Sequence, residues 1–161
     1  MTATAIPADL QPVEPAYRIA LRVRATIFWV PVFIGSLILD RSLLATTPFS
    51  GLLPALIAAI GLSAIIIAPA RIYRRLGYAI DGRLLRTVRG WLFHTDTIVP
   101  FVRVQHIDVT RGPVDKLFGT ASLVVHTAGT HNNVVVVPGL APDRADALRS
   151  MIRATIRSDL V

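Results

Sequence analysis

The chain has 161 residues, of which 53% are hydrophobic and 17% are charged, and its mean hydropathy is +0.57. Because an ordinary soluble domain is less apolar and more highly charged, this composition predicts that part of the chain lies in lipid. The chain contains no cysteine, which excludes disulfides, thiolate zinc sites and a cysteine nucleophile.

The formal net charge is +7, and its distribution argues against a nucleic-acid partner. Six basic residues flank two apolar runs, whereas residues 76–161 carry ten basic and seven acidic residues. A domain that binds nucleic acid gathers its basic residues on one surface, and no such excess remains outside the apolar region.

Residues 1–16 contain three prolines and little periodicity, so we expect a disordered cytoplasmic leader there. Two uncharged runs follow, at residues 25–39 and 50–70. A helix of about 20 residues spans a bilayer. The pattern therefore predicts a membrane anchor over 17–75, with two transmembrane helices at about 25–45 and 50–70.

Three arginines precede the first run and three follow the second, while the connection between the runs is short. By the positive-inside rule, both chain termini are then cytoplasmic and the protein is a multi-pass protein of the cytoplasmic membrane. Asp40 lies near the end of the first run, beside Arg41, and we expect it at an interfacial helix end rather than in a polar membrane site.

Residues 76–161 change to short β-rich runs separated by turn signals, and they predict an antiparallel meander in a cytoplasmic domain. Near the end of the chain, the apolar residues Ala145, Leu148, Ile152 and Ile156 recur at helical spacing. We expect this helix to cover the open face of the sheet; the alternative is that its arginines hold it on anionic lipid.

Within residues 102–111, the apolar positions change parity between Val104 and Ile107. Because strand side chains alternate with period two, a strand with one buried face needs a β-bulge near Gln105-His106. Such a bulge would direct Arg103, Gln105 or His106 outward.

Residues 112–119 then combine turn formers with Leu117-Phe118 and Gly119. Leu117 and Phe118 are expected to anchor this segment, and glycine permits the positive φ that returns the chain to the next strand. The segment fits a structural loop and also fits a partner-docking element.

The order of these motifs resembles the bacterial pleckstrin-homology family of the YdbS type. The resemblance rests on "YAIDGRLLRTVRGWL", "IVPFVRVQHIDVTRGPVDKLFGTASLVVHTAG" and "VPGL…ADALRSMI", and it covers nearly all of residues 72–156. It implies an α+β fold in which a two-helix transmembrane hairpin precedes a PH-like antiparallel β-barrel or sandwich, capped by a C-terminal α-helix.

The resemblance also implies a position at the cytoplasmic face of the membrane and no known catalytic activity. Members of the family often occur beside a larger membrane protein that carries several such domains, and some are linked to tolerance of antimicrobial compounds.

The residues themselves give no pattern for catalysis, a metal or a cofactor. The four histidines do not have the spacing of a helix-based ligand pair, and Ser122 lies in a plain strand rather than in a nucleophile elbow. The glycine-containing turns do not join a strand to a helix with the spacing of a phosphate-binding loop. We therefore expect a binding protein rather than an enzyme.

Two kinds of binding remain open. In the first, the domain docks another membrane protein, such as a larger protein with several PH-like domains, or a second copy; the residues expected at this surface are Arg103, Gln105, His106, Lys116, Leu117, Phe118 and Gly119. In the alternative, the domain senses anionic lipid headgroups through Arg71, Arg74, Arg75, Arg83, Arg86 and Arg89.

Overall fold

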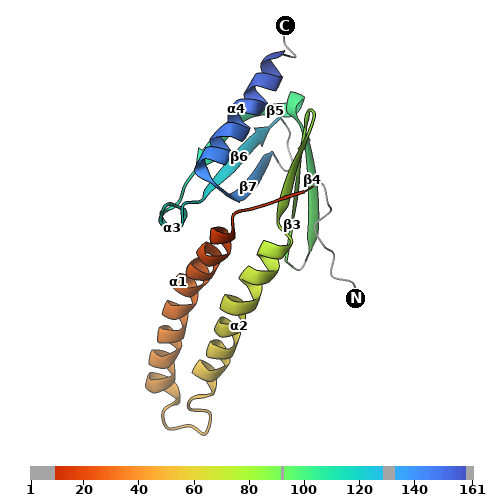
Figure 1. The fold of residues 1–161 in the computed structure, drawn as a ribbon. Helices are drawn as coiled ribbons and strands as arrows, with labels where there is room; N and C mark the ends of the chain where they lie inside the picture. The colour runs from red at the N-terminus through yellow and green to blue at the C-terminus, as the bar shows by residue number, and fades with distance from the viewer. Residues whose placement is uncertain (1–9, 92, 129–132, 159–161) are drawn as a thin grey trace.

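The computed structural model describes residues 10–91, 93–128 and 133–158. It shows a two-helix hairpin below a domain of two β-sheets and a long C-terminal helix (Figure 1). The hairpin helices are α1 (Pro15–Leu39), which continues through a π-helical turn (Asp40–Leu44), and α2 (Leu52–Arg74). Both are long and apolar enough to cross a membrane, as expected.

The first helix begins at Pro15, well before the expected start near residue 25. Proline suits a first helical turn because its missing N–H would have no partner within the helix. The uncharged run is therefore only part of α1, and Arg18, Arg22 and Arg24 lie on the helical turns that connect it to the domain.

Close packing joins the two hairpin helices at Gly61, where an added Cβ would lie 3.2 Å from the Trp29 ring. At the far end, the buried carboxylate of Asp40 accepts the N–H of Gly51 at 3.0 Å. Asp40 thus lies at the end of α1, as expected, and it closes the loop to α2.

The domain contains two antiparallel sheets that match the PH-like sandwich expected from the sequence. The first has the order β1-β2-β3-β4, formed by Gln11–Pro12, Gly77–Asp81, Leu84–Gly90 and His94–Pro100. The second has the order β5-β6-β7, formed by Val104–Thr110, Ala121–Thr127 and Val134–Leu140. The strands in the described parts of the chain do not close into a barrel.

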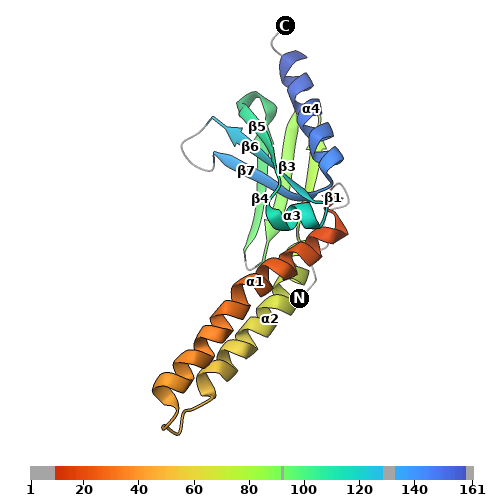
Figure 2. The ribbon, with the colours of Figure 1, turned by 90° about the vertical axis from the view of Figure 1, so that its left-hand side faces the viewer.

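Helix α4 (Pro142–Ser158) covers the core between the sheets (Figure 2). Its Ala145, Leu148 and Ile152 are buried in the core cluster, and Ile156 packs at the edge of this cluster. The expected capping role is confirmed, because the apolar face that repeats at helical spacing is the face that leaves water.

The prediction of a disordered leader is wrong for residues 10–16. Gln11 pairs with Tyr78 as an edge strand, Leu10 and Val13 are buried, and the N–H of Glu14 donates to the carbonyl of Gly139 at 2.8 Å. An edge strand tolerates proline because one row of its backbone groups has no partner in the sheet. Residues 1–9 of the expected leader lie outside the described residues.

Candidate docking site

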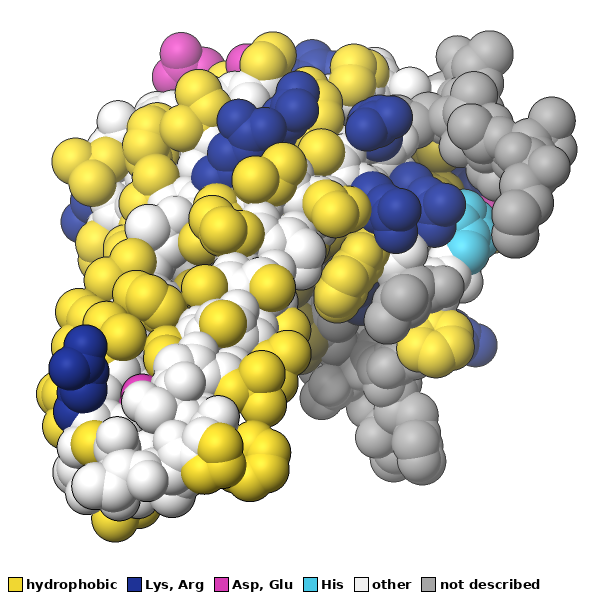
Figure 3. All heavy atoms as spheres, turned by 90° about the horizontal axis from the view of Figure 1, so that it is seen from below, with side chains coloured by type: hydrophobic (Ala, Val, Ile, Leu, Met, Phe, Trp, Pro, Cys, Tyr) yellow, Lys and Arg dark blue, Asp and Glu magenta, His cyan; other side chains and the backbone are white. Residues whose placement is uncertain are grey.

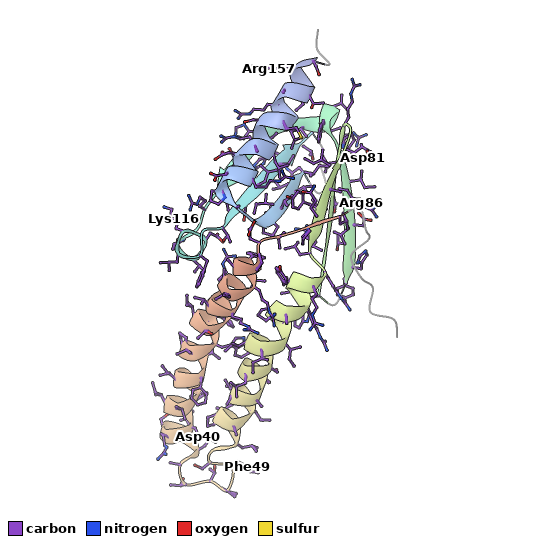
Figure 4. All side chains as sticks on the ribbon, viewed as in Figure 1. Asp40, Phe49, Asp81, Arg86, Lys116 and Arg157 are labelled. Carbon is purple, nitrogen blue, oxygen red and sulfur yellow. The ribbon has the colours of Figure 1, made fainter. Side chains whose placement is uncertain are left out.

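The structure separates the residues expected at the docking surface into two groups. Arg103, Gln105 and His106 lie at or beside the start of β5, whereas residues 116–119 belong to and follow the short helix α3 (Pro113–Leu117). Arg157, at the end of α4, lines the same groove as Gln105 and His106. Figure 4 shows Lys116 on the side of the domain that faces the hairpin and Arg157 far from the hairpin. The two groups therefore do not form one surface.

The first group borders a groove between β5 and α4, at the end of the domain remote from the hairpin. We name it the distal groove. Its volume is about 270 Å³, and it is lined by Val104, Gln105, His106, Ile107, Arg153, Ile156 and Arg157.

A β-bulge shapes the wall that β5 contributes to the distal groove. The pairing with β6 shifts register between Val104 and His106, which confirms the bulge expected from the sequence. As a result, Gln105 and His106 are both exposed although they are consecutive, while Ile107 returns to the core. In a regular strand, one of the two exposed side chains would point inward.

The opposite wall of the distal groove carries two cations from one helix. Arg153 and Arg157 are exposed, and neither has a hydrogen bond or ion pair with another residue in the described parts of the chain. A guanidinium binds a carboxylate or phosphate through two parallel hydrogen bonds. Ile156 lies between them in the lining, so the groove places two cations beside an apolar side chain.

Asp108 orients the histidines next to the distal groove. His106 Nε2 lies 2.8 Å from Asp108 Oδ1, and His126 Nε2, from the neighbouring strand, lies 3.6 Å from Asp108 Oδ2. Within residues 10–91, 93–128 and 133–158, no group of three or more His, Cys, Asp and Glu side chains could hold a metal ion. His131 lies outside the described residues.

The second group surrounds a buried carboxylate that the sequence reasoning did not single out. Asp115 is 4% exposed, and its carboxylate accepts hydrogen bonds from Arg24 at 2.6 Å, from the Gly112 N–H at 3.1 Å and from the Thr120 hydroxyl at 3.0 Å. Arg24 belongs to α1, so Asp115 joins the membrane hairpin to the domain. The signal in the sequence was Gly112-Pro113 with an acidic residue in the first helical turn.

Residues 116–119 only partly behave as expected. Phe118 packs against the core, and Gly119 has a φ of +63° that favours glycine, so these two residues fix the segment. Leu117, however, is 79% exposed and anchors nothing in the described structure. The expectation that both apolar side chains would hold the segment is wrong for Leu117, because one turn of helix points the two in different directions.

The arginines considered for lipid headgroups do not converge. Arg71, Arg74 and Arg75 lie at the end of α2, whereas Arg83 lies in the β2–β3 turn at the other end of the sheet. Arg86 forms an ion pair with Asp96 at 2.6 Å, and its guanidinium holds the pKa of that carboxyl below its usual range. Arg89, near the end of β3, returns to the hairpin side.

Comparisons with known proteins agree with this architecture. A family model described as "Bacterial PH domain" matches residues 25–156. The chain is 40% identical over 63 residues to the UPF0699 transmembrane protein YdbS of Bacillus subtilis (strain 168); this region is 39% of the chain and 38% of that protein. The chain therefore matches well under two thirds of the relative's length. No solved structure matches the chain.

Proposed function

Because the chain belongs to the bacterial PH domain family and carries two helices fit to cross a membrane, we propose that it is a non-catalytic docking module of the cytoplasmic membrane. In this proposal both termini are cytoplasmic, and the hairpin holds the PH-like domain at the inner face. The domain docks another membrane protein or a second copy of the chain. Its role is scaffolding in an envelope or stress-related complex, in line with the tolerance of antimicrobial compounds that the family resemblance implies.

The observation that carries this proposal is the distal groove. It combines exposed polar groups of the β5 bulge with two α4 arginines and apolar side chains. A carboxylate held by both arginines, with an apolar neighbour against Ile156, would use both kinds of lining. The partner chemistry that fits is an acidic peptide segment with at least one apolar side chain.

The position of the groove favours a protein partner over the lipid of the same membrane. Helix α4 starts beside the β7–α1 contact and rises about 1.5 Å per residue, so Arg153 and Arg157 lie about 17 and 23 Å from its first residue, Pro142. Charges are screened over about 8–10 Å at physiological ionic strength. Headgroups next to the hairpin would therefore attract these two arginines only weakly.

The experiment is a quantitative affinity purification of the full chain from native membranes in mild detergent. It compares wild type with the double variant Arg153→Glu/Arg157→Glu. Arg149→Glu is the matched control, because Arg149 lies on the same helix, outside the groove, in an exposed pair with Asp146.

We expect one protein partner to be enriched with wild type and with Arg149→Glu, and to fall at least tenfold with the double variant. A loss of about 1.4 kcal/mol gives a factor of ten, and one charge-assisted hydrogen bond contributes about that much. Equal recovery by all three chains would rule out the distal groove as the docking surface. Recovery of the chain alone with enriched anionic lipid would instead support the headgroup-sensor alternative.

A further inference from the structure

The end of the domain that faces the hairpin carries two exposed apolar points. One, which we name the turn tip, consists of Trp91 and Phe93 between β3 and β4; these side chains are 45% and 83% exposed. The other, the helix tip, is Leu117 on α3, at 79% exposed. Large apolar side chains left in water at the same end of a domain indicate a contact with lipid or protein.

The structure fixes the position of each tip relative to the hairpin. Arg24 is the last charged residue before the uncharged run of α1, and it forms the 2.6 Å ion pair with Asp115 of α3. Arg75 ends α2, and its guanidinium donates to the carbonyl of Trp91 at 3.1 Å. The helix tip is thus tied to one hairpin helix and the turn tip to the other.

These two ties place the tips at the depth of the headgroups. Arg24 directly borders the apolar run of α1, and Arg75 lies five residues, or about 7.5 Å, past the end of the run in α2. The headgroup region on each side of a bilayer is about 5–8 Å thick. Both arginines, and the segments they hold, therefore lie within the interfacial layer when the hairpin crosses the membrane.

The side chains at this level suit that layer. Tryptophan is enriched at membrane interfaces, and phenylalanine and leucine gain free energy when their apolar surface leaves water. Arg74, Arg89 and Lys116 are exposed on the same segments and can contact anionic headgroups, at about 1 kcal/mol each. From the hairpin side, Figure 3 shows Lys and Arg side chains beside hydrophobic ones where the hairpin meets the domain.

We propose that the PH-like domain rests on the membrane through the turn tip and the helix tip, which insert into the interfacial layer of the leaflet from which the hairpin emerges. The two tips adjoin different helices of the hairpin, so a flat bilayer surface reaches both at once. This contact does not depend on the distal groove or its partner. It makes the domain a third membrane contact beside the two helices, and it directs the distal groove away from the lipid.

The test uses spin labels on the full chain in liposomes. Since the chain has no cysteine, Phe93→Cys and Leu117→Cys each give one labelling site. Val102→Cys is the matched control: Val102 is 87% exposed but lies in the turn before β5, at the remote end of the domain. The measurement compares collisions with oxygen, which concentrates in lipid, and with a nickel chelate, which stays in water.

We expect the oxygen-to-nickel collision ratio at positions 93 and 117 to exceed the ratio at position 102 severalfold. Equal ratios at the three positions would overturn the proposal, because both tips would then lie in water. A high ratio at only one tip would overturn the two-point contact. Low collision rates with both reagents would mean that protein, here a second copy, covers the tips, and this outcome would also overturn it.

Discussion

The two ends of the PH-like domain differ in the polar groups that define them, a buried carboxylate at one end and two exposed cations at the other. At the hairpin end, Asp115 is buried and accepts three hydrogen bonds, and Tyr17 packs against Gly139. At the remote end, Arg153 and Arg157 lack partners among the described residues, and a bulge interrupts β5. A buried carboxylate with its hydrogen bonds satisfied favours a rigid joint at that point, whereas unpaired exposed cations at the other end favour binding.

We therefore expect the hairpin end of the domain to determine its stability and the remote end to determine its binding. Substitutions at the hairpin end should change the free energy of unfolding, and substitutions at the distal groove should change binding with little effect on stability. Substitutions of Gly139 and Asp115 test the first half of that statement, the charge reversals at the groove test the second half, and Asp96 gives a reference point between the two ends.

Gly139→Ala should have the largest effect on stability. Gly139 has a φ of +73°, and an added Cβ would lie 2.5 Å from Cγ of the buried Tyr17 ring. Strain and overlap together should lower the free energy of unfolding by about 3 kcal/mol. The measurement is urea unfolding of the full chain in mild detergent, followed by circular dichroism.

The control for this prediction is Gly119→Ala. Gly119 also has a positive φ, of +63°, but an added Cβ would meet no atom within 4 Å. We expect a loss of only about 1 kcal/mol from backbone strain. Equal losses for the two variants would show that the contact of Tyr17 with β7 does not stabilise the joint.

Asp115→Ala should have the next largest effect. It leaves the Gly112 N–H, the Thr120 hydroxyl and the Arg24 guanidinium without their acceptor. We expect a loss of about 2 kcal/mol in the same unfolding measurement, less than for a fully buried pair because the Arg24 side chain is 42% exposed.

Asp146→Ala is the matched control, since it removes a carboxylate from the exposed pair with Arg149. Exposed pairs of this kind contribute about 0.2–1 kcal/mol. If both substitutions cost the same, Asp115 is not the residue that ties the hairpin to the domain.

The smallest effect concerns Asp96, which lies between the two ends. Its pKa is lowered in the folded chain, chiefly by the hydrogen bond from Arg86, so the folded state favours the ionised form. The stabilisation is then present above the unfolded pKa of about 3.9 and is lost as the pH falls through the lower folded value. Because the two side chains are 34% and 31% exposed, it amounts to less than about 1 kcal/mol.

The check for Asp96 is the difference in unfolding free energy between wild type and Asp96→Asn. We expect a small difference at pH 7 that shrinks in acid as the wild-type carboxyl takes up its proton. A difference that grows in acid would have the wrong sign for a lowered pKa. Pull-down through the distal groove should be the same for both chains.

Periodic patterns predicted much of this structure because they report burial directly. The parity change between Val104 and Ile107 located the bulge, and the spacing of Leu148 and Ile152 located the helix that covers the core. Two helices long and apolar enough to cross a membrane followed from the uncharged runs. In each case a side-chain period determined which face leaves water.

The remaining features depend on contacts between distant parts of the chain, which a local pattern does not show. Residues 10–14 have the composition of a proline-rich leader. They are ordered by pairing with β2 and by a hydrogen bond to a carbonyl of β7, and both contacts come from later in the chain. Nothing local distinguishes Asp115 from the other acidic residues, because its partner Arg24 lies 91 positions earlier in the chain.

The pairing of β1 with β2 has a consequence for biogenesis. These adjacent strands are the stretches of chain directly before and after the hairpin, so the two membrane helices form an insertion within one sheet. In the proposed topology, the edge strand can join only after both helices have crossed the membrane and returned the chain to the side where it started. In that topology, completion of the first sheet depends on correct membrane insertion, and a hairpin with only one helix inserted leaves β2 with an unpaired edge.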